Sequence, residues 1–125
     1  MKNLVDSCGW LEYFAGGPNA GFFAKPLRNL RDLLVPSICV LEVFKQILRQ
    51  RDENSALIAA AAMLQGNVVD LDAAIALNAA KIGSELNLPL ADSVILATAL
   101  SHDAVVWTED SHFKGIKGVR YVEKQ

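Results

Sequence analysis

The sequence predicts a three-layer α/β/α sandwich whose central five-stranded sheet is mostly parallel. Short runs of β-branched and aliphatic residues alternate with segments in which apolar residues recur at helical spacing. This alternation is typical of β-α-β crossovers, which cover both faces of a parallel sheet with helices. The chain has 125 residues, enough to bury a hydrophobic core without disulfides. We therefore expect one domain spanning residues 1–125.

The pattern of apolar and turn residues in the first third of the chain predicts a strand, two helices and a second strand. An apolar run at residues 3–5 forms the first strand, and Ser7 can cap a helix that continues to Phe14. A turn rich in glycine, proline and asparagine follows, before a second helical stretch at about residues 20–30. The apolar run at residues 33–35 then predicts the second strand.

The middle of the chain continues the alternation. Ser37 can cap a helix in which apolar residues recur at helical spacing from Ile38 to Leu48. The longest apolar run, at residues 56–64, is rich in alanine and predicts another packed helix. It is far shorter than the ~20 residues that a membrane span needs. Residues 68–71 predict a third strand.

The last third supplies two helices and two strands. Asp72 can cap a helix that runs to about Leu86. Residues 91–100 have little polar face, which predicts a helix buried between its neighbours. The runs at residues 105–108 and 119–122 predict the fourth and fifth strands.

Charge and the N-terminus narrow the classes of function. The formal net charge of -2 lacks the basic excess that marks a non-specific nucleic-acid binder. Any contact with nucleic acid must therefore be local and rest on metal ions and small basic patches. The chain reaches Asp6 before an apolar stretch of signal-peptide length can develop, so we expect a cytoplasmic protein with no membrane segment.

The two cysteines, Cys8 and Cys39, are expected to be buried thiols and not a disulfide. A nucleophilic or zinc site could in principle combine Cys8 with His102 or His112. No Cys-x-x-Cys or His-x-x-x-His spacing supports such a site. We therefore set this alternative aside.

Acidic residues occur where ligands bind in open parallel sheets, outside the carboxyl ends of the strands. Asp6 closes the first strand, and Asp110 follows the fourth by two residues. Glu42 lies little more than one turn into the helix after the second strand. Asp92 lies in the first turn of the buried helix, where a charge needs a partner. We predict that these four acids form one site.

Four converging carboxylates repel one another unless a cation lies between them. Oxygen ligands without His or Cys suit Mg²⁺ or Mn²⁺ better than zinc. We predict Asp6, Asp92 and Asp110 as metal ligands, and Glu42 as a ligand or as the base that orients water for phosphodiester hydrolysis. Each acid alone also has an ordinary explanation as a strand end, cap, turn or solvated helix face. Their joint placement favours the functional interpretation.

Several neighbouring polar residues have two interpretations. Thr108 ends a strand and either hydrogen-bonds a metal ligand or phosphate, or simply reflects strand propensity. Ser7 caps the first helix and can also approach the phosphate. Glu42 shares one polar stripe of its helix with Lys45 and Arg49. That stripe is either a solvated face or a set of contacts to RNA phosphates.

Four segments and a closing strand at residues 116–122 together resemble the PIN-domain nucleases, above all the VapC-type toxins of type II toxin-antitoxin systems. The segments are LVDS at 4–7, PSICVLE at 36–42, LADSVILATA at 90–99 and TEDSHF at 108–113. The resemblance covers nearly the whole chain, and its specificity lies in the ordered set. It implies a PIN fold and Mg²⁺- or Mn²⁺-dependent RNA endonuclease activity. It also implies a homodimer and a cognate VapB-type antitoxin that occupies the acidic groove.

The resemblance carries the acidic roles to Asp6, Glu42, Asp92 and Asp110, with Thr108 as a supporting residue. Glu109 departs from the family pattern, in which a basic or small residue often follows the threonine. It either joins the metal shell or points to solvent.

Three functions remain open from the sequence. The leading hypothesis is a toxin that cleaves single-stranded or looped RNA. The second is a housekeeping RNA-processing nuclease with the same site and no antitoxin. The third is a non-catalytic module that binds RNA or protein and retains the acidic pocket.

Overall fold

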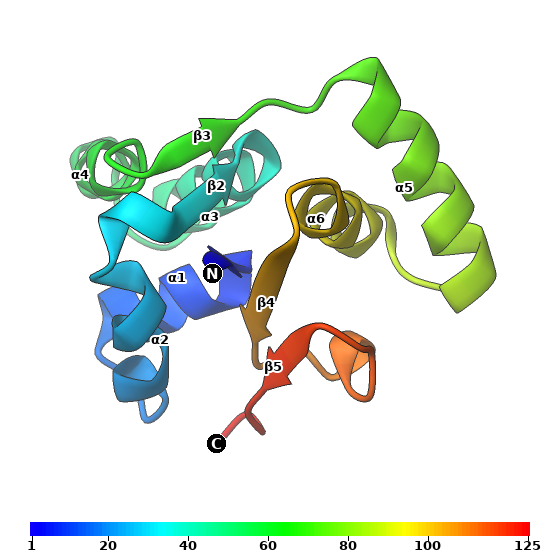
Figure 1. The fold of residues 1–125 in the computed structure, drawn as a ribbon. Helices are drawn as coiled ribbons and strands as arrows, with labels where there is room; N and C mark the ends of the chain where they lie inside the picture. The colour runs from blue at the N-terminus through cyan, green and yellow to red at the C-terminus, as the bar shows by residue number, and fades with distance from the viewer.

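A five-stranded parallel sheet forms the centre of the computed structural model, which describes residues 1–125. The strands lie in the order β3-β2-β1-β4-β5, and every neighbouring pair is parallel (Figure 1). Their bounds are β1 Lys2–Val5, β2 Leu33–Pro36, β3 Asn67–Val69, β4 Ala104–Thr108 and β5 Val119–Tyr121. The predicted fold class is confirmed, and the sheet is wholly parallel.

Six α-helices and two short 3₁₀ turns connect the strands. Helices α1 and α2 lie on the opposite side of β1 and β4 from α5 and α6 (Figure 1). Helix α1 packs on α2, α3 on α4, and α5 on α6. The bounds are α1 Ser7–Ala15, α2 Ala20–Leu27, η1 Leu30–Asp32, α3 Ser37–Gln50, α4 Glu53–Met63, α5 Ala73–Leu86, α6 Leu90–Ser101 and η2 Ser111–Phe113.

The second helix was predicted too long. It ends at Leu27 rather than Leu30, because the chain leaves helical geometry at Asn29, whose φ is -98° and ψ is 72°. The chain then makes the η1 turn and enters β2 directly at Leu33. Local composition did not reveal this break, because residues 28–30 contain neither glycine nor proline.

Two predicted helix caps were wrong and one is confirmed. Asp6, not Ser7, caps α1: its Oδ1 accepts a hydrogen bond from the backbone N–H of Cys8 at 2.9 Å. Pro36 occupies the cap position of α3, and the Ser37 hydroxyl accepts from the N–H of Leu71 instead. Asp72 caps α5 as predicted, accepting from the N–H of residue 75 at 2.8 Å.

The hydrophobic core lies on both faces of the sheet and includes helix α6. Eight consecutive residues of α6, from Asp92 to Ala99, are buried, which confirms the predicted burial of this helix. Cys39 is buried and Cys8 only half-buried, so the prediction of two buried thiols was wrong for Cys8, which opens onto a cavity beside α1. Both thiols are free. None of the helices has the length and apolar character needed to cross a bilayer.

The strand order reverses direction next to β1. The chain moves outward from β1 through β2 to β3, then returns to place β4 on the other side of β1. Val5 is in register with Trp107, so the carboxyl ends of β1 and β4 lie side by side. Open parallel sheets form their ligand crevice at such a reversal. Asp6 and Thr108 therefore meet at the point where a site is expected.

Candidate active site

Asp6 is fixed at the carboxyl end of β1 by two hydrogen bonds. Its Oδ1 accepts from the backbone N–H of Cys8, and its Oδ2 accepts from the Thr108 hydroxyl at 2.5 Å. The residue is only 4% exposed. The carboxylate thus caps a helix and is held by a side chain of the neighbouring strand, so its position is defined by backbone geometry.

Thr108 connects two of the predicted acids. Its hydroxyl donates to Asp6 and accepts from the backbone N–H of Asp110 at 2.9 Å. The residue is fully buried at the end of β4. Both hydrogen bonds go to site residues, so strand propensity alone does not explain the hydroxyl. The supporting role predicted for Thr108 remains a proposal, argued from this geometry.

Glu42 faces the same region from the second turn of α3. Its Oε1 accepts a hydrogen bond from the Ser7 hydroxyl at 2.5 Å. Ser7 is buried at the start of α1, and its hydroxyl is therefore committed to Glu42. This contact ties α1 to α3 at the site and orients the Glu42 carboxylate.

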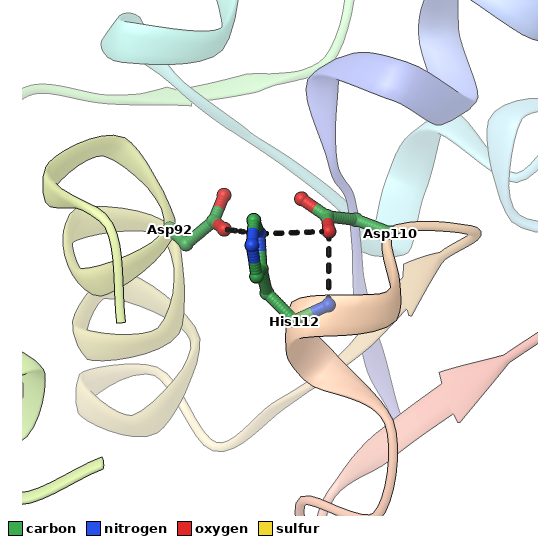
Figure 2. A group of neighbouring side chains, drawn as sticks. All are labelled: Asp92, Asp110 and His112. Atoms are coloured by element: carbon green, nitrogen blue, oxygen red, sulfur yellow. Dashed lines mark hydrogen bonds and ion pairs between the residues drawn. The ribbon is translucent and has the colours of Figure 1, made fainter. Parts of the chain in front are cut away.

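Asp92 and Asp110 approach each other from α6 and from the loop after β4, with His112 between them (Figure 2). The His112 Nδ1 atom lies 3.1 Å from Asp92 Oδ2 and 3.0 Å from Asp110 Oδ1. The backbone N–H of His112 also donates to Asp110 Oδ1, at 2.9 Å. One ligand atom from each of these three residues lies within 4.8 Å of the others.

One cavity of about 530 Å³ brings all four predicted acids together. The basic side chains Lys45 and Arg49 line the same cavity, as does Gln46 between them on α3. The polar stripe of α3 therefore borders the acids and is not a remote solvated face. Among the lining residues are Asp6, Ser7, Glu42, Lys45, Arg49, Asp92 and Asp110.

Burial and mutual repulsion weaken the acidity of two of these carboxyls. Burial raises the pKa of Asp6, although the hydrogen bonds from Thr108 and Cys8 act in the opposite direction. Burial, followed by the charges of Asp110 and Asp6, raises the pKa of Asp92 to about 7, while His112 opposes the rise. Negative charge is therefore costly in this cavity without a cation.

The residues present fit a divalent cation. His112 makes both of the molecule's ion pairs, so no lysine or arginine neutralises the four acids at close range. Carboxylate oxygens that converge without a neutralising lysine or arginine are the usual ligands of Mg²⁺ and Mn²⁺. Asp92, Asp110 and His112 have ligand atoms close enough to share one ion, and Asp6 is near enough for its charge to raise the pKa of Asp92.

Glu109 takes neither of the positions considered for it. It is only 5% exposed, and its Oε1 accepts a hydrogen bond from Asn19 Nδ2 at 3.0 Å. Asn19 Nδ2 also donates to the backbone carbonyl of Glu123. Glu109 therefore belongs to a buried network that joins the α1–α2 turn, the end of β4 and the C-terminal segment.

His112 and Asn19 are the polar residues that the sequence analysis did not place at the site or its support. A signal for His112 exists in the Asp-x-His spacing after β4, which differs from the Cys-x-x-Cys and His-x-x-x-His spacings of zinc sites. Asn19 lies in a turn rich in glycine and proline, where an asparagine is ordinary. No local pattern marks its contact with Glu109, which is 90 residues away.

Comparison with known proteins adds a family model and several solved structures. The model described as PIN domain matches residues 4–119. No curated protein sequence matches the chain. A toxin-antitoxin complex from Klebsiella pneumoniae contains a chain with a TM-score of 0.79 and 24% identity, covering 95% of this chain and 96% of that one.

Two further structures have the same fold at lower identity. DNA-bound VapBC from Salmonella typhimurium has a TM-score of 0.75 and 20% identity, with 98% of each chain covered. A VapC toxin from Mycobacterium tuberculosis, described as sarcin-ricin loop cleaving, has a TM-score of 0.73 and 18% identity. It covers 95% of this chain and 99% of that one. At identities below 25%, the structural similarity establishes a shared fold and no more.

Proposed function

The chain belongs to the PIN domain family, and from this premise we propose that it is a metal-dependent endoribonuclease, the toxin of a VapBC-type pair. PIN domains are nucleases. The observation that carries the proposal is the convergence of Asp6, Glu42, Asp92 and Asp110 on one cavity at the reversal of strand order. Four acids with no lysine or arginine within ion-pair distance suit hydrolysis assisted by Mg²⁺ or Mn²⁺.

The proposed roles follow from how each carboxylate is held. Asp6, Asp92 and Asp110 hold the cation. A divalent cation bound there would lower the pKa of a water molecule and neutralise negative charge at the scissile phosphate. Glu42, oriented by the Ser7 hydroxyl, directs the attacking water and accepts its proton at Oε2. Thr108 holds Asp6 and Asp110 close together, because its hydroxyl is hydrogen-bonded to the Asp6 carboxylate and to the Asp110 backbone N–H.

Lys45 and Arg49 are proposed to bind the phosphates that flank the scissile bond. Both line the acidic cavity one and two turns beyond Glu42 on α3. A pair of local cations agrees with the net charge of -2, which offers no broad attraction for nucleic acid. An open groove of this kind suits single-stranded or looped RNA, because only splayed nucleotides reach its floor.

The toxin role, a homodimer and a VapB-type partner are proposed together. In their support, the similar structures include toxin-antitoxin and VapBC complexes that cover nearly the whole chain. We place the protein in the cytoplasm, where its RNA substrates are found. A housekeeping RNA-processing nuclease remains the second candidate. Harmless expression of a chain that cleaves RNA well would favour this second function.

RNA cleavage with matched aspartate variants tests the proposal. We expect cleavage of a panel of structured RNAs to stop with EDTA, return with Mn²⁺ and vanish in Asp6→Asn. Asp103→Asn is the matched control, because residue 103 lies in a turn with φ of 53°, a conformation that asparagine tolerates. Cleavage that survives EDTA or Asp6→Asn would contradict the metal mechanism and leave the non-catalytic binding module as the alternative.

Growth on expression tests the toxin role separately. Wild-type chain should arrest growth, and Asp92→Asn should relieve the arrest at equal protein levels. A short neighbouring reading frame that encodes a DNA-binding protein should also relieve it. Arrest that persists in Asp92→Asn would mean that toxicity does not come from the nuclease site.

A further inference from the structure

His112 has no structural task in the core that would explain its position. Its side chain is 56% exposed, on the one-turn helix η2. Yet the ring is not directed to solvent: Nδ1 contacts the carboxylates of both Asp92 and Asp110 (Figure 2). An exposed imidazole that bridges two of the four acids is available to a ligand.

The spacing of the three atoms suits one octahedral ion. Nδ1 lies 3.1 Å from Asp92 Oδ2 and 3.0 Å from Asp110 Oδ1. In an octahedron with metal–ligand distances of roughly 2.0–2.2 Å, neighbouring ligand atoms are separated by about 2.8–3.1 Å. The nitrogen therefore already has the separation of a neighbouring ligand from each of the two oxygens, and all three atoms lie within 4.8 Å of one another.

The surrounding bonds hold His112 in this position. Asp110 Oδ1 accepts a hydrogen bond from the backbone N–H of His112 at 2.9 Å, and the His112 ring bonds Asp92 Oδ2 through Nδ1 while lying 3.0 Å from Asp110 Oδ1. Asp110 itself is held through its N–H by Thr108, which also holds Asp6. The imidazole is thus connected by short, defined contacts to three of the four acids.

We propose that His112 is a nitrogen ligand of the site's cation, and that it makes the site favour Mn²⁺ over Mg²⁺. This inference rests on the proposed function and names the ion that the function uses. Mg²⁺ accepts oxygen ligands almost exclusively, whereas imidazole binds transition-metal ions well. A site with only the carboxylates would discriminate weakly between the two ions. One imidazole adds affinity for Mn²⁺ and little for Mg²⁺.

An alternative assigns His112 only a hydrogen-bonding role. In that case the ring is a counter-charge for Asp92 and Asp110, and it leaves when a cation arrives. The two possibilities differ in whether nitrogen is bonded to the metal in the loaded protein. Spectroscopy of the bound ion separates them without reference to activity.

The decisive experiment is electron spin-echo envelope modulation of Mn²⁺ bound to the full chain. The chain has two histidines, and His102 bonds only to Ser101 and Thr98 at the end of α6, so His102→Ala is a matched control. We expect ¹⁴N modulation in the wild type and in His102→Ala, and none in His112→Ala. Bound Mn²⁺ without ¹⁴N modulation in the wild type would overturn the proposal.

Calorimetric titration of Mn²⁺ and Mg²⁺ supplies an independent readout. We expect His112→Ala to weaken Mn²⁺ binding at least ~10-fold and Mg²⁺ binding less than ~3-fold, the loss expected for one selective ligand. His112→Asp, which offers oxygen instead, should restore affinity for both ions and abolish the preference. Equal losses for the two ions in His112→Ala would contradict the inference.

Failure of this inference is distinguishable from failure of the proposed function. If RNA cleavage still requires a divalent cation and Asp6 while Mn²⁺ shows no nitrogen coupling, only the role of His112 is wrong. If neither ion binds, the proposed nuclease fails and the inference fails with it. Because the His112 side chain is largely exposed, circular dichroism should show both variants folded.

Discussion

At the scale of single residues, Thr108 positions Asp6 and Asp110 relative to each other. Its hydroxyl accepts from the Asp110 backbone and donates to Asp6. The donated hydrogen bond lowers the pKa of Asp6, in opposition to burial. A cation ligand must be deprotonated, so the hydroxyl favours the binding form of a buried acid.

Thr108→Val keeps the shape of the side chain and removes the hydrogen bonds to Asp6 and Asp110, together with the 3.5 Å contact to Cys8 Sγ. We expect the pKa of Asp6 to rise further and divalent-cation affinity to fall by roughly 10-fold, as is typical when a residue that orients a metal ligand is lost. Thr108→Ser should retain most of the affinity. Calorimetric titration with Mn²⁺ measures both variants, and unchanged affinity in Thr108→Val would contradict the role given to the hydroxyl.

Asp92 makes stability depend on pH in the metal-free protein. Its pKa is about 7 in the folded chain, against 3.8 for an unperturbed group. Between these values the folded state binds a proton that the unfolded state has released. The free energy of unfolding therefore decreases as pH rises through this interval, to the extent that Asp92 controls it.

Asp92→Asn removes the ionisable group, and with it the loss of unfolding free energy that ionisation of Asp92 causes at high pH. In EDTA we expect the variant's Tm to exceed that of the wild type by ~4 °C or more at pH 8, the shift that about 1 kcal/mol produces in a domain of this size, and by less at pH 4. Thermal unfolding followed by circular dichroism checks it. A Tm difference that is the same at both pH values would show that Asp92 is not the group responsible.

At the scale of secondary-structure elements, the contact between α5 and α6 determines where Asp92 lies. Gly83 on α5 faces Ser93 on α6, and a Cβ atom built at Gly83 would lie 2.4 Å from Ser93 Oγ. The Ser93 hydroxyl is itself bonded to the carbonyls of Leu88 and Pro89 at the start of α6. The helices touch because residue 83 has no side chain.

Gly83→Ala should therefore separate the two helices next to Asp92. Overpacking of this kind costs about 1–3 kcal/mol, partly offset because alanine favours the helix more than glycine does. We expect a lower midpoint in urea denaturation and weaker Mn²⁺ binding than in the wild type. Gly21→Ala on α2, where an added Cβ meets nothing, is the control. Equal stability of the two variants would contradict the close contact.

Strands and helix caps could be predicted where the residues that determine them are close in sequence. Side-chain contacts between distant residues could not. Alternating apolar runs predicted all five strands, and Asp72 was identified as a cap because its partner lies three residues away. The caps assigned to Ser7 and Ser37 were wrong because both hydroxyls bond to residues 34 or more positions away. His112 has one partner, Asp110, only two residues away, but its contact with Asp92 spans 20 residues and leaves no local pattern.

At the scale of the whole molecule, an apolar groove opens on the surface between α3 and the edge strand β3. Leu41, Leu48, Leu64 and Val68 are exposed there and line a cavity of about 570 Å³. Exposed apolar patches of this kind are typical of protein interfaces. For the proposed homodimer, we expect this surface to form the contact between the two chains.

Leu48→Arg tests that contact. The wild type should elute at twice the 13.6 kDa mass of the chain in size-exclusion chromatography with light scattering, and Leu48→Arg should elute at the monomer mass. Leu100→Arg, an exposed leucine at the end of α6, should stay dimeric. A wild type that is monomeric at all concentrations, or a dimeric Leu48→Arg, would contradict the assignment.

The hydrogen bond between Thr108 and Asp6 joins residues 102 positions apart, and Asn19 reaches the carbonyl of Glu123 across 104. During translation, the early acids leave the ribosome long before β4 and the C-terminal segment. Chains begin to fold from the N-terminus as they are synthesised, yet here β1 must wait for its partner β4. A nascent chain therefore has isolated carboxylates and no hydrolytic centre. For the proposed ribonuclease, the strand order delays assembly of the site until β4 and the residues after it have been synthesised.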